Sequence, residues 1–221
     1  MAFDVSNLAG WIRKWTAKSY GEGDFKAPDF NSRGDQIVAQ GLPERSELVR
    51  MGRSYSAQIP AASAFTLLIT IPTTRTELAL QNGEAVGGLS YVIDRFWVKA
   101  VTSMASAAEL TPLSQLVIPG TALVADNTAV LRTSLSGRGV GSKAQLCIAS
   151  TATGCLTDKW NHHAGRSIPE TTNIAALVSV ECFGRYIVPP QGNFSMNAQE
   201  SVSGGTAIMG VEWHEVQLDV A

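Results

Sequence analysis

The chain carries little charge and few of the residues from which catalytic and metal sites are built. Only 16% of its 221 residues are Asp, Glu, Lys or Arg, and the formal net charge is −2. Such a balance gives no general attraction to nucleic acid or to an anionic membrane, so neither is expected as a partner. The three cysteines contain no Cys-x-x-Cys pair, which excludes a zinc ribbon.

Long apolar runs are also missing. The longest windows, such as FTLLITI at 65–71, have the length of a strand and are too short to cross a bilayer. Near the N-terminus, Arg13 and Lys14 break the apolar stretch that a secretion signal requires. Synthesis in a cytoplasm is therefore expected, whatever the final location of the protein.

What the sequence does contain is typical of a turn-rich β protein. Hydrophobic residues make up 45% of the chain, and 20 Gly and 9 Pro separate short apolar segments. Strands are expected within residues 65–71, 89–101, 144–150, 174–188, 193–201 and 206–218, and a hairpin about Asp126-Asn127 is expected within residues 121–135. The pattern predicts an all-β fold, an antiparallel β-sandwich of jelly-roll type over residues 51–221. It does not sort Trp97, Trp160 and Trp213 into core and interface.

The last of these strands contains a change of pattern. Apolar residues occupy alternate positions up to Trp213 and then shift by one position to Val216 and Leu218. Because neighbouring side chains in a strand point to opposite faces, such a shift predicts a β-bulge near residue 214 or a switch between contacts.

Residues 1–50 are predicted to form an N-terminal helix followed by an extended arm. Over residues 4–20 the apolar side chains recur at helical spacing, while residues 21–50 lack any periodicity. The helix could pack on its own domain, dock into a partner subunit or lie on a membrane surface. The predicted partner-binding residues are Leu8, Trp11, Ile12, Trp15, Phe25 and Phe30.

Candidates for catalysis are few. Adjacent residues of a strand point to opposite faces, so His162 and His163 make a poor chelating pair. The favoured interpretation is a pair of loop histidines that are solvated or cap backbone groups. Glu212 and His214 share one strand face, but without a nucleophile they are interpreted as a surface ion pair with each other near the bulge. The glycine-rich segment 136–143 lacks the spacing of a phosphate-binding loop. We therefore expect no enzymatic activity, no catalytic or metal site, and no cofactor.

Two further features have both an ordinary and a special interpretation. Cys147 and Cys155 flank a plausible hairpin and could form a disulfide, but packing as buried thiols, together with Cys182, is favoured. The Arg-Gly-Asp tripeptide at 33–35 matches a cell-adhesion signal, although a match of only three residues carries a large false-positive risk. A turn in the arm, with Gly34 supplying the flexibility, is the favoured interpretation.

The segment 184–216, GRYIVPPQGNFSMNAQESVSGGTAIMGVEWHEV, resembles the closing segment of virion structural proteins of tailed bacteriophages. In that pattern a Val-Pro-Pro-like turn leads through Gly-x-Phe-x-Met and a glycine turn into a last strand with Trp and Glu. The matching positions are Val188, Pro189, Pro190, Gly192, Phe194, Gly204, Gly205, Trp213 and Glu215.

The resemblance implies a β-sandwich subunit that is a capsid cement or decoration protein on the virion surface. It implies a homotrimer, made in the host cytoplasm, with the major capsid protein as partner and residues 1–50 as the attachment region. The alternative is a tail or fibre component that binds a host receptor or glycan, for which the loops 136–143 and 153–166 are the candidate contacts.

Overall fold

The computed structural model describes residues 44–73, 75–102, 108–117, 130–137, 141–151, 159–168, 176–201 and 204–218. The predicted helix at 4–20, the Arg-Gly-Asp tripeptide and all six predicted partner-binding residues (Leu8, Trp11, Ile12, Trp15, Phe25 and Phe30) lie outside this part. So do Cys155 and the centre of the predicted hairpin at 121–135.

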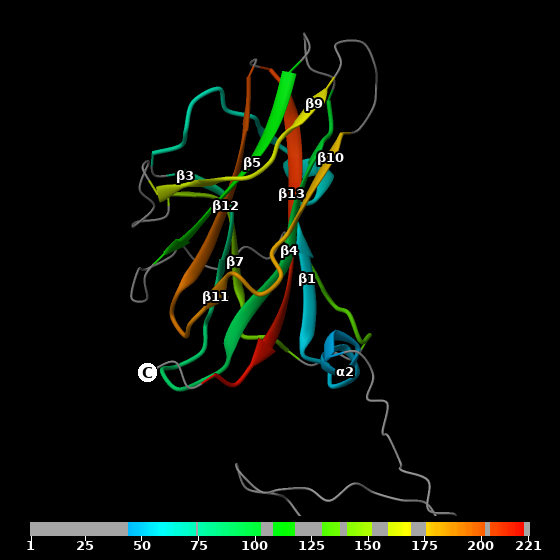
Figure 1. Ribbon diagram of the computed structural model, residues 1–221, viewed down its shortest axis with the longest axis vertical. Helices are drawn as coiled ribbons and strands as arrows, with labels where there is room; N and C mark the ends of the chain where they lie inside the picture. Colours follow the sequence, from blue (N-terminus) through cyan, green and yellow to red (C-terminus); the bar gives the residue numbers. More distant parts are fainter. Residues whose placement is uncertain are drawn as a thin grey trace, which may run out of the picture. The chain divides into compact units, whose positions relative to one another are not determined.

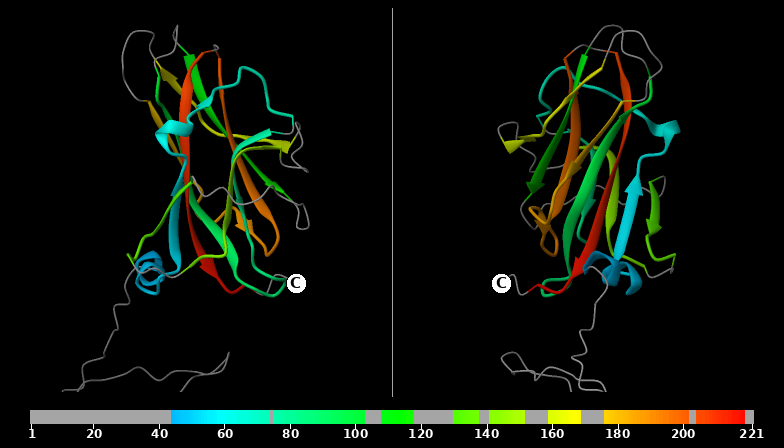
Figure 2. Two further views of the ribbon diagram at one scale, coloured as in Figure 1. Left: turned by 180° about the vertical axis from the view of Figure 1, so that it is seen from behind. Right: turned by 45° about the vertical axis from the view of Figure 1, so that its right-hand side comes forward.

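Two antiparallel sheets pack against each other (Figures 1 and 2), which confirms the predicted all-β antiparallel sandwich. The first, called the β13 sheet, has the strand order β10-β4-β13-β1-β6, with β11 beside β4 and β2 beside β13. The second, called the β12 sheet, has the order β7-β3-β12-β5-β8, with β9 beside β5. The elements are α2 (Glu44–Arg50), β1 (Ser54–Gln58), the short 3-10 helix η2 (Ala61–Ser63), β2 (Phe65–Thr66), β3 (Arg75–Gln81), β4 (Ser90–Ala100), β5 (Ala108–Val117), β6 (Leu131–Ser134), β7 (Gln145–Thr151), β8 (Asn161–His162), β9 (Arg166–Ile168), β10 (Leu177–Glu181), β11 (Ile187–Val188), β12 (Asn193–Glu200) and β13 (Thr206–Val216).

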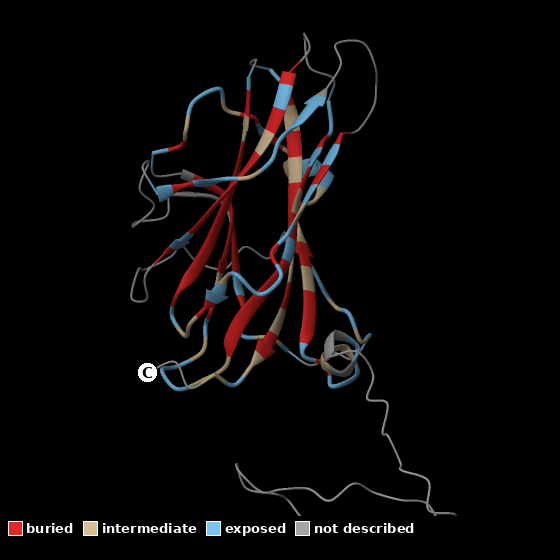
Figure 3. Ribbon diagram, viewed as in Figure 1, coloured by how far each residue is buried: buried red, intermediate tan, exposed pale blue. Residues whose placement is uncertain are grey.

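The hydrophobic core lies between the sheets, where β4, β12 and β13 carry the most buried residues (Figure 3). Phe96 of β4 and Phe194 of β12 meet edge to face, with ring centroids 5.7 Å apart, and so join one sheet to the other. Tyr55 and Trp213 stack at 5.5 Å within the β13 sheet. Alternate apolar residues of each strand fill this space, as the sequence pattern predicted.

The predicted strand at 65–71 is shorter than expected. Only Phe65–Thr66 pairs with β13, and the chain then crosses to the β12 sheet. There Leu68 accepts a hydrogen bond from the Glu200 N–H, and Gln199 Nε2 donates to the Ile69 carbonyl. Because the segment changes sheets, the alternate apolar residues after Leu67 do not all lie on one buried face. Ile69, for example, is exposed.

The predicted bulge is present, but it lies in the partner strand. Between β13 and β4 the register shifts so that Glu212 faces Arg95 while Trp213 faces Ile93, which leaves Asp94 as the extra residue of β4. The alternation of β13 therefore continues, and Glu215 stays on the buried face with Trp213. The expectation that side chains turn over after residue 214 is wrong, because a bulge in β4 absorbs the mismatch.

The last seven residues of the predicted extended arm, Glu44–Arg50, form the helix α2 instead. The helix ends in a Schellman motif. The Gly52 N–H donates to the Val49 carbonyl, and the Arg53 N–H donates to the Leu48 carbonyl. Gly52 has a φ of 74°, a conformation that glycine adopts without steric cost. The motif fixes the direction in which the chain enters β1.

Candidate functional site

The structure separates the two residues that the sequence placed together as an acid–base pair. Both Glu212 and His214 lie on the outer face of β13, but Glu212 forms an ion pair with Arg95 and His214 binds Asp94. The ion pair expected between Glu212 and His214 is therefore not formed, because each side chain has another partner. The carboxylate beside His214 comes from the bulge in β4.

His214 and Asp94 form a partly buried pair. The Nδ1 atom of His214 lies 3.1 Å from Asp94 Oδ1 and 3.0 Å from Oδ2. Ser54 of β1 is directly opposite His214 in the strand register, and Asp94 reaches His214 from the bulge of β4, so a serine, a histidine and an aspartate come from three adjacent strands. Among the described residues no hydrogen bond joins the Ser54 hydroxyl to the imidazole. These three residues therefore lack the nucleophile–base contact of a hydrolytic triad.

A groove with a volume of about 490 Å³ lies over this pair on the outer face of the β13 sheet. Its size is within the range of ligand and side-chain binding sites. Most of its lining is apolar, and the polar groups are those of Asp94 and His214. The groove is lined by Leu48, Val92, Asp94, Phe183, Gly184, Ile187, His214, Val216 and Leu218.

One wall of the groove is the turn between β10 and β11, where Phe183 is 72% exposed. Phe183 has a φ of 47°, which places a bulky side chain in the left-handed region. The turn is held by hydrogen bonds from the Cys182 N–H to the Asp94 carbonyl (2.8 Å) and from the Arg185 N–H to the Cys182 carbonyl (2.9 Å). Gly184 also has a positive φ, of 73°, so Phe183 and Gly184 form a tight turn that presents the aromatic ring to solvent beside the groove.

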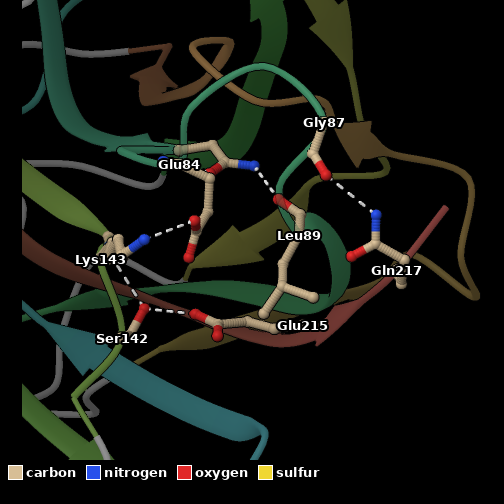
Figure 4. Close-up of polar contacts among 9 residues, drawn as sticks. Glu84, Gly87, Leu89, Ser142, Lys143, Glu215 and Gln217 are labelled. Carbon is tan, nitrogen blue, oxygen red and sulfur yellow. Dashed lines mark hydrogen bonds and ion pairs between the residues drawn. The ribbon is translucent and has the colours of Figure 1, made fainter. Parts of the chain in front are cut away.

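A second polar cluster lies around the buried Glu215 (Figure 4). The Ser142 hydroxyl donates to Glu215 Oε1 and accepts a hydrogen bond from the Ala144 N–H (3.0 Å). Burial raises the pKa of Glu215, an effect that the Ser142 hydrogen bond opposes. Lys143 Nζ binds Glu84 Oε2 at 2.8 Å. These contacts hold Ser142 and Lys143, at the end of the glycine-rich segment 136–143, against the sandwich. They stabilise the fold and form no ligand site.

The adjacent histidines lie in different surroundings, because His162 is the last residue of β8, whereas His163 follows the strand and packs on Phe96. His162 is exposed, whereas His163 is half-buried, with its Nε2 atom 2.8 Å from the Ser114 hydroxyl. Burial lowers the pKa of His163. Within the ranges that the structure describes, no group of three or more His, Cys, Asp or Glu side chains is placed to hold a metal ion.

Cys147 and Cys182 are both buried, and the Cys182 thiol donates a weak hydrogen bond to the Val180 carbonyl at 3.7 Å. Burial raises the pKa of Cys182 to about 12, so its thiol stays protonated at neutral pH. The alternative, a disulfide between Cys147 and Cys155, is untested, because Cys155 lies outside the described residues.

Comparisons with protein-family models, with curated proteins and with solved structures find no match to this chain. None of the helices in the described part is long and apolar enough to span a membrane. The function of the protein must therefore be inferred from the groove and the side chains around it.

Proposed function

We propose that this protein is a structural subunit of a bacteriophage particle, of the capsid cement or decoration type. It binds the major capsid protein through the groove between α2 and the β10–β11 turn. The observation that carries the proposal is the exposed, strained Phe183 beside an apolar groove. The resemblance of residues 184–216 to phage virion proteins supports the same assignment, since that segment contains Phe194, Trp213 and the β11–β12 turn.

The chemistry of the groove suits a protein partner. Phe183 and Ile187 are exposed next to the half-buried Val216, so an apolar side chain of the partner would lose its contact with water on entering. Burial of one large apolar side chain contributes roughly 1.5 to 3 kcal/mol. A cement protein adds many such contacts over a particle, because each subunit repeats the same interface. The predicted homotrimer and the attachment role of residues 1–50 remain part of this proposal.

The test is binding of the purified chain to capsids that have been stripped of it, measured by co-sedimentation. Phe183→Ser removes the aromatic ring and is expected to weaken binding by about tenfold or more. Val86→Ser is the matched control, because Val86 is 83% exposed but lies on the β3–β4 loop. Equal binding by wild type and Phe183→Ser would overturn the role of the groove.

A tail or fibre component that binds a host receptor is the alternative. The same experiment separates the two, because a tail component would not bind emptied heads at all. Removal of residues 1–43, which keeps α2 and Leu48 of the groove, provides the second arm of the test. Unchanged occupancy by the shortened chain would exclude these residues as the attachment region.

A further inference from the structure

A second surface on the outer face of the β13 sheet has a different chemistry from the groove and shares none of its residues. Trp97 of β4 lies between Gly210 of β13 and Ser179 of β10 in the strand register. Around it is a shallow depression with a volume of about 250 Å³. We call this surface the tryptophan platform; it is lined by Arg95, Trp97, Lys99, Leu177 and Ser179.

Gly210 determines how the indole of Trp97 lies. A Cβ atom at position 210 would be 2.5 Å from Cζ2 and 2.6 Å from Cε2 of Trp97. Such distances are far inside van der Waals contact, so the indole occupies the space that a side chain at 210 would fill. The ring is therefore packed down on the backbone of β13 while the residue remains half-buried, with part of its surface open to solvent.

Beside the indole, Arg95 and Glu212 form a pair with two hydrogen bonds. Arg95 Nε donates to Glu212 Oε2 at 2.8 Å, and Nη2 donates to Oε1 at 2.6 Å. The Arg95 side chain is 45% exposed and that of Glu212 is 20% exposed, so both keep donors and acceptors that a ligand can reach. A paired guanidinium and carboxylate hold each other in place and need little reorganisation on binding.

The rest of the rim adds further polar groups. Lys99 and Ser179 are exposed, and the Ser179 hydroxyl lies 3.5 Å from Glu181 Oε1. From β9, Arg166 Nη1 donates to the Leu177 carbonyl at 3.4 Å. One flat aromatic surface among groups of both charges differs from the contiguous apolar area of a protein–protein core.

We propose that the tryptophan platform is a carbohydrate-binding site. A sugar ring has an apolar face of C–H groups, which suits the indole, and a rim of hydroxyls, which suits fixed donors and acceptors. The pyranose stacks on Trp97, and its hydroxyls hydrogen-bond to Arg95 and Glu212, with Ser179 and Lys99 at the far rim. The site goes beyond the proposed cement function and does not depend on it.

The experiment uses the full chain on a microarray of bacterial and plant polysaccharides, followed by titration calorimetry with the polysaccharide that gives the strongest signal. Wild type is expected to bind, and Trp97→Ala is expected to lose about tenfold or more in affinity. Ser179→Arg is a second variant, which fills the depression from an exposed position and leaves the indole in place. It is expected to show the same loss.

Phe183→Ser is the matched control, because it changes the groove and should leave the polysaccharide signal unchanged. No array signal for wild type, or equal signals for wild type, Trp97→Ala and Ser179→Arg, would overturn the carbohydrate site. Light scattering of the same variants tests a second copy of the chain as occupant. If Trp97→Ala lowers the solution mass and wild type binds no polysaccharide, the platform is a subunit interface and the proposal is wrong.

Discussion

The two central strands of the sandwich differ in what lies on their outer faces. On β12, the outward residues Ser195 and Asn197 are buried, although they are polar. On β13, the outward residues Glu212 and His214 are only half-buried, and their ion-pair partners come from β4. The outer face of the β12 sheet is therefore covered, and the outer face of the β13 sheet is the one that a partner can reach.

The cover of the β12 sheet is built in part by Trp160 and Ile71, which pack with Leu113 and Val117 of β5. Trp160 Nε1 donates to the Pro72 carbonyl at 2.9 Å and so ties the cover together. Burial of polar side chains under such a cover requires internal hydrogen bonds, for example from the Ser195 hydroxyl to Asn193 Oδ1. The difference indicates that both faces of the β12 sheet contribute to stability. The β13 sheet contributes to stability with its inner face and to recognition with its outer face.

Truncation of the shared core should have the largest effect. Phe194→Ala removes the ring that contacts Phe96 and Tyr186 across the sandwich, and we expect a loss of about 3 to 5 kcal/mol in the free energy of unfolding. Phe183→Ala, which changes an exposed ring, should lose far less. Chemical denaturation of both variants measures the two losses. Similar losses would contradict the claim that Phe194 stabilises the fold and Phe183 does not.

Gly210→Ala should have the next largest effect, because its Cβ would clash with Trp97 and lie 2.8 Å from the Ala57 carbonyl oxygen. We expect a loss of about 1 to 3 kcal/mol. Gly141→Ala is the matched control, since a Cβ there has open space around it. A neutral Gly210→Ala would show that the indole does not rest on the strand.

A smaller, pH-dependent effect is expected at Glu215. Burial raises its pKa above the ordinary value of about 4.5, so the folded state holds the proton more tightly than the unfolded state. Its contribution to stability is full below the ordinary value and is lost as pH rises through the raised value. Glu215→Gln keeps the acceptor for Ser142 but removes this titration. Urea unfolding from pH 4 to pH 8 should show a smaller decline for the variant; an identical decline would contradict the assignment.

The smallest effect is expected for Phe183→Gly. Glycine removes the left-handed strain at this position but adds freedom to the unfolded chain, so the net change should be within about 1 kcal/mol. Capsid binding should nevertheless fall as for Phe183→Ser. Loss of stability comparable to that of a core variant would show that the ring supports the fold.

The strands with apolar residues on both faces were the most predictable part of the fold. The pattern of 89–101 predicted β4 almost to its ends, because both faces of β4 are covered over much of their length. The strand predicted at 65–71 is too long for a physical reason. The segment crosses from the β13 sheet to the β12 sheet, so its alternate side chains do not all face the same core. The sequence predicted the bulge near its actual position. Its assignment to β4 required the register between β4 and β13, which the sequence does not contain.

The candidate sites were less predictable, because each depends on contacts between distant segments. The sequence identified His214 and Glu212 but not their partners, since Asp94 and Arg95 reach them only through the β4–β13 register. Gly184, with a φ of 73°, signals a turn at this place, but no residue type predicts that Phe183 also has a positive φ. The three tryptophans became separable only in the fold. Trp213 lies in the core, Trp160 lies under the cover of the β12 sheet, and Trp97 lies on the open face.

Hydrogen exchange of the full chain, alone and on emptied capsids, tests most directly whether the outer face of the β13 sheet is the binding surface. On binding, the backbone amides of the turn 182–187 should exchange more slowly, and those of the β3–β4 loop 82–89 should not change. Slower exchange in the loop 82–89, with the turn unchanged, would contradict this prediction.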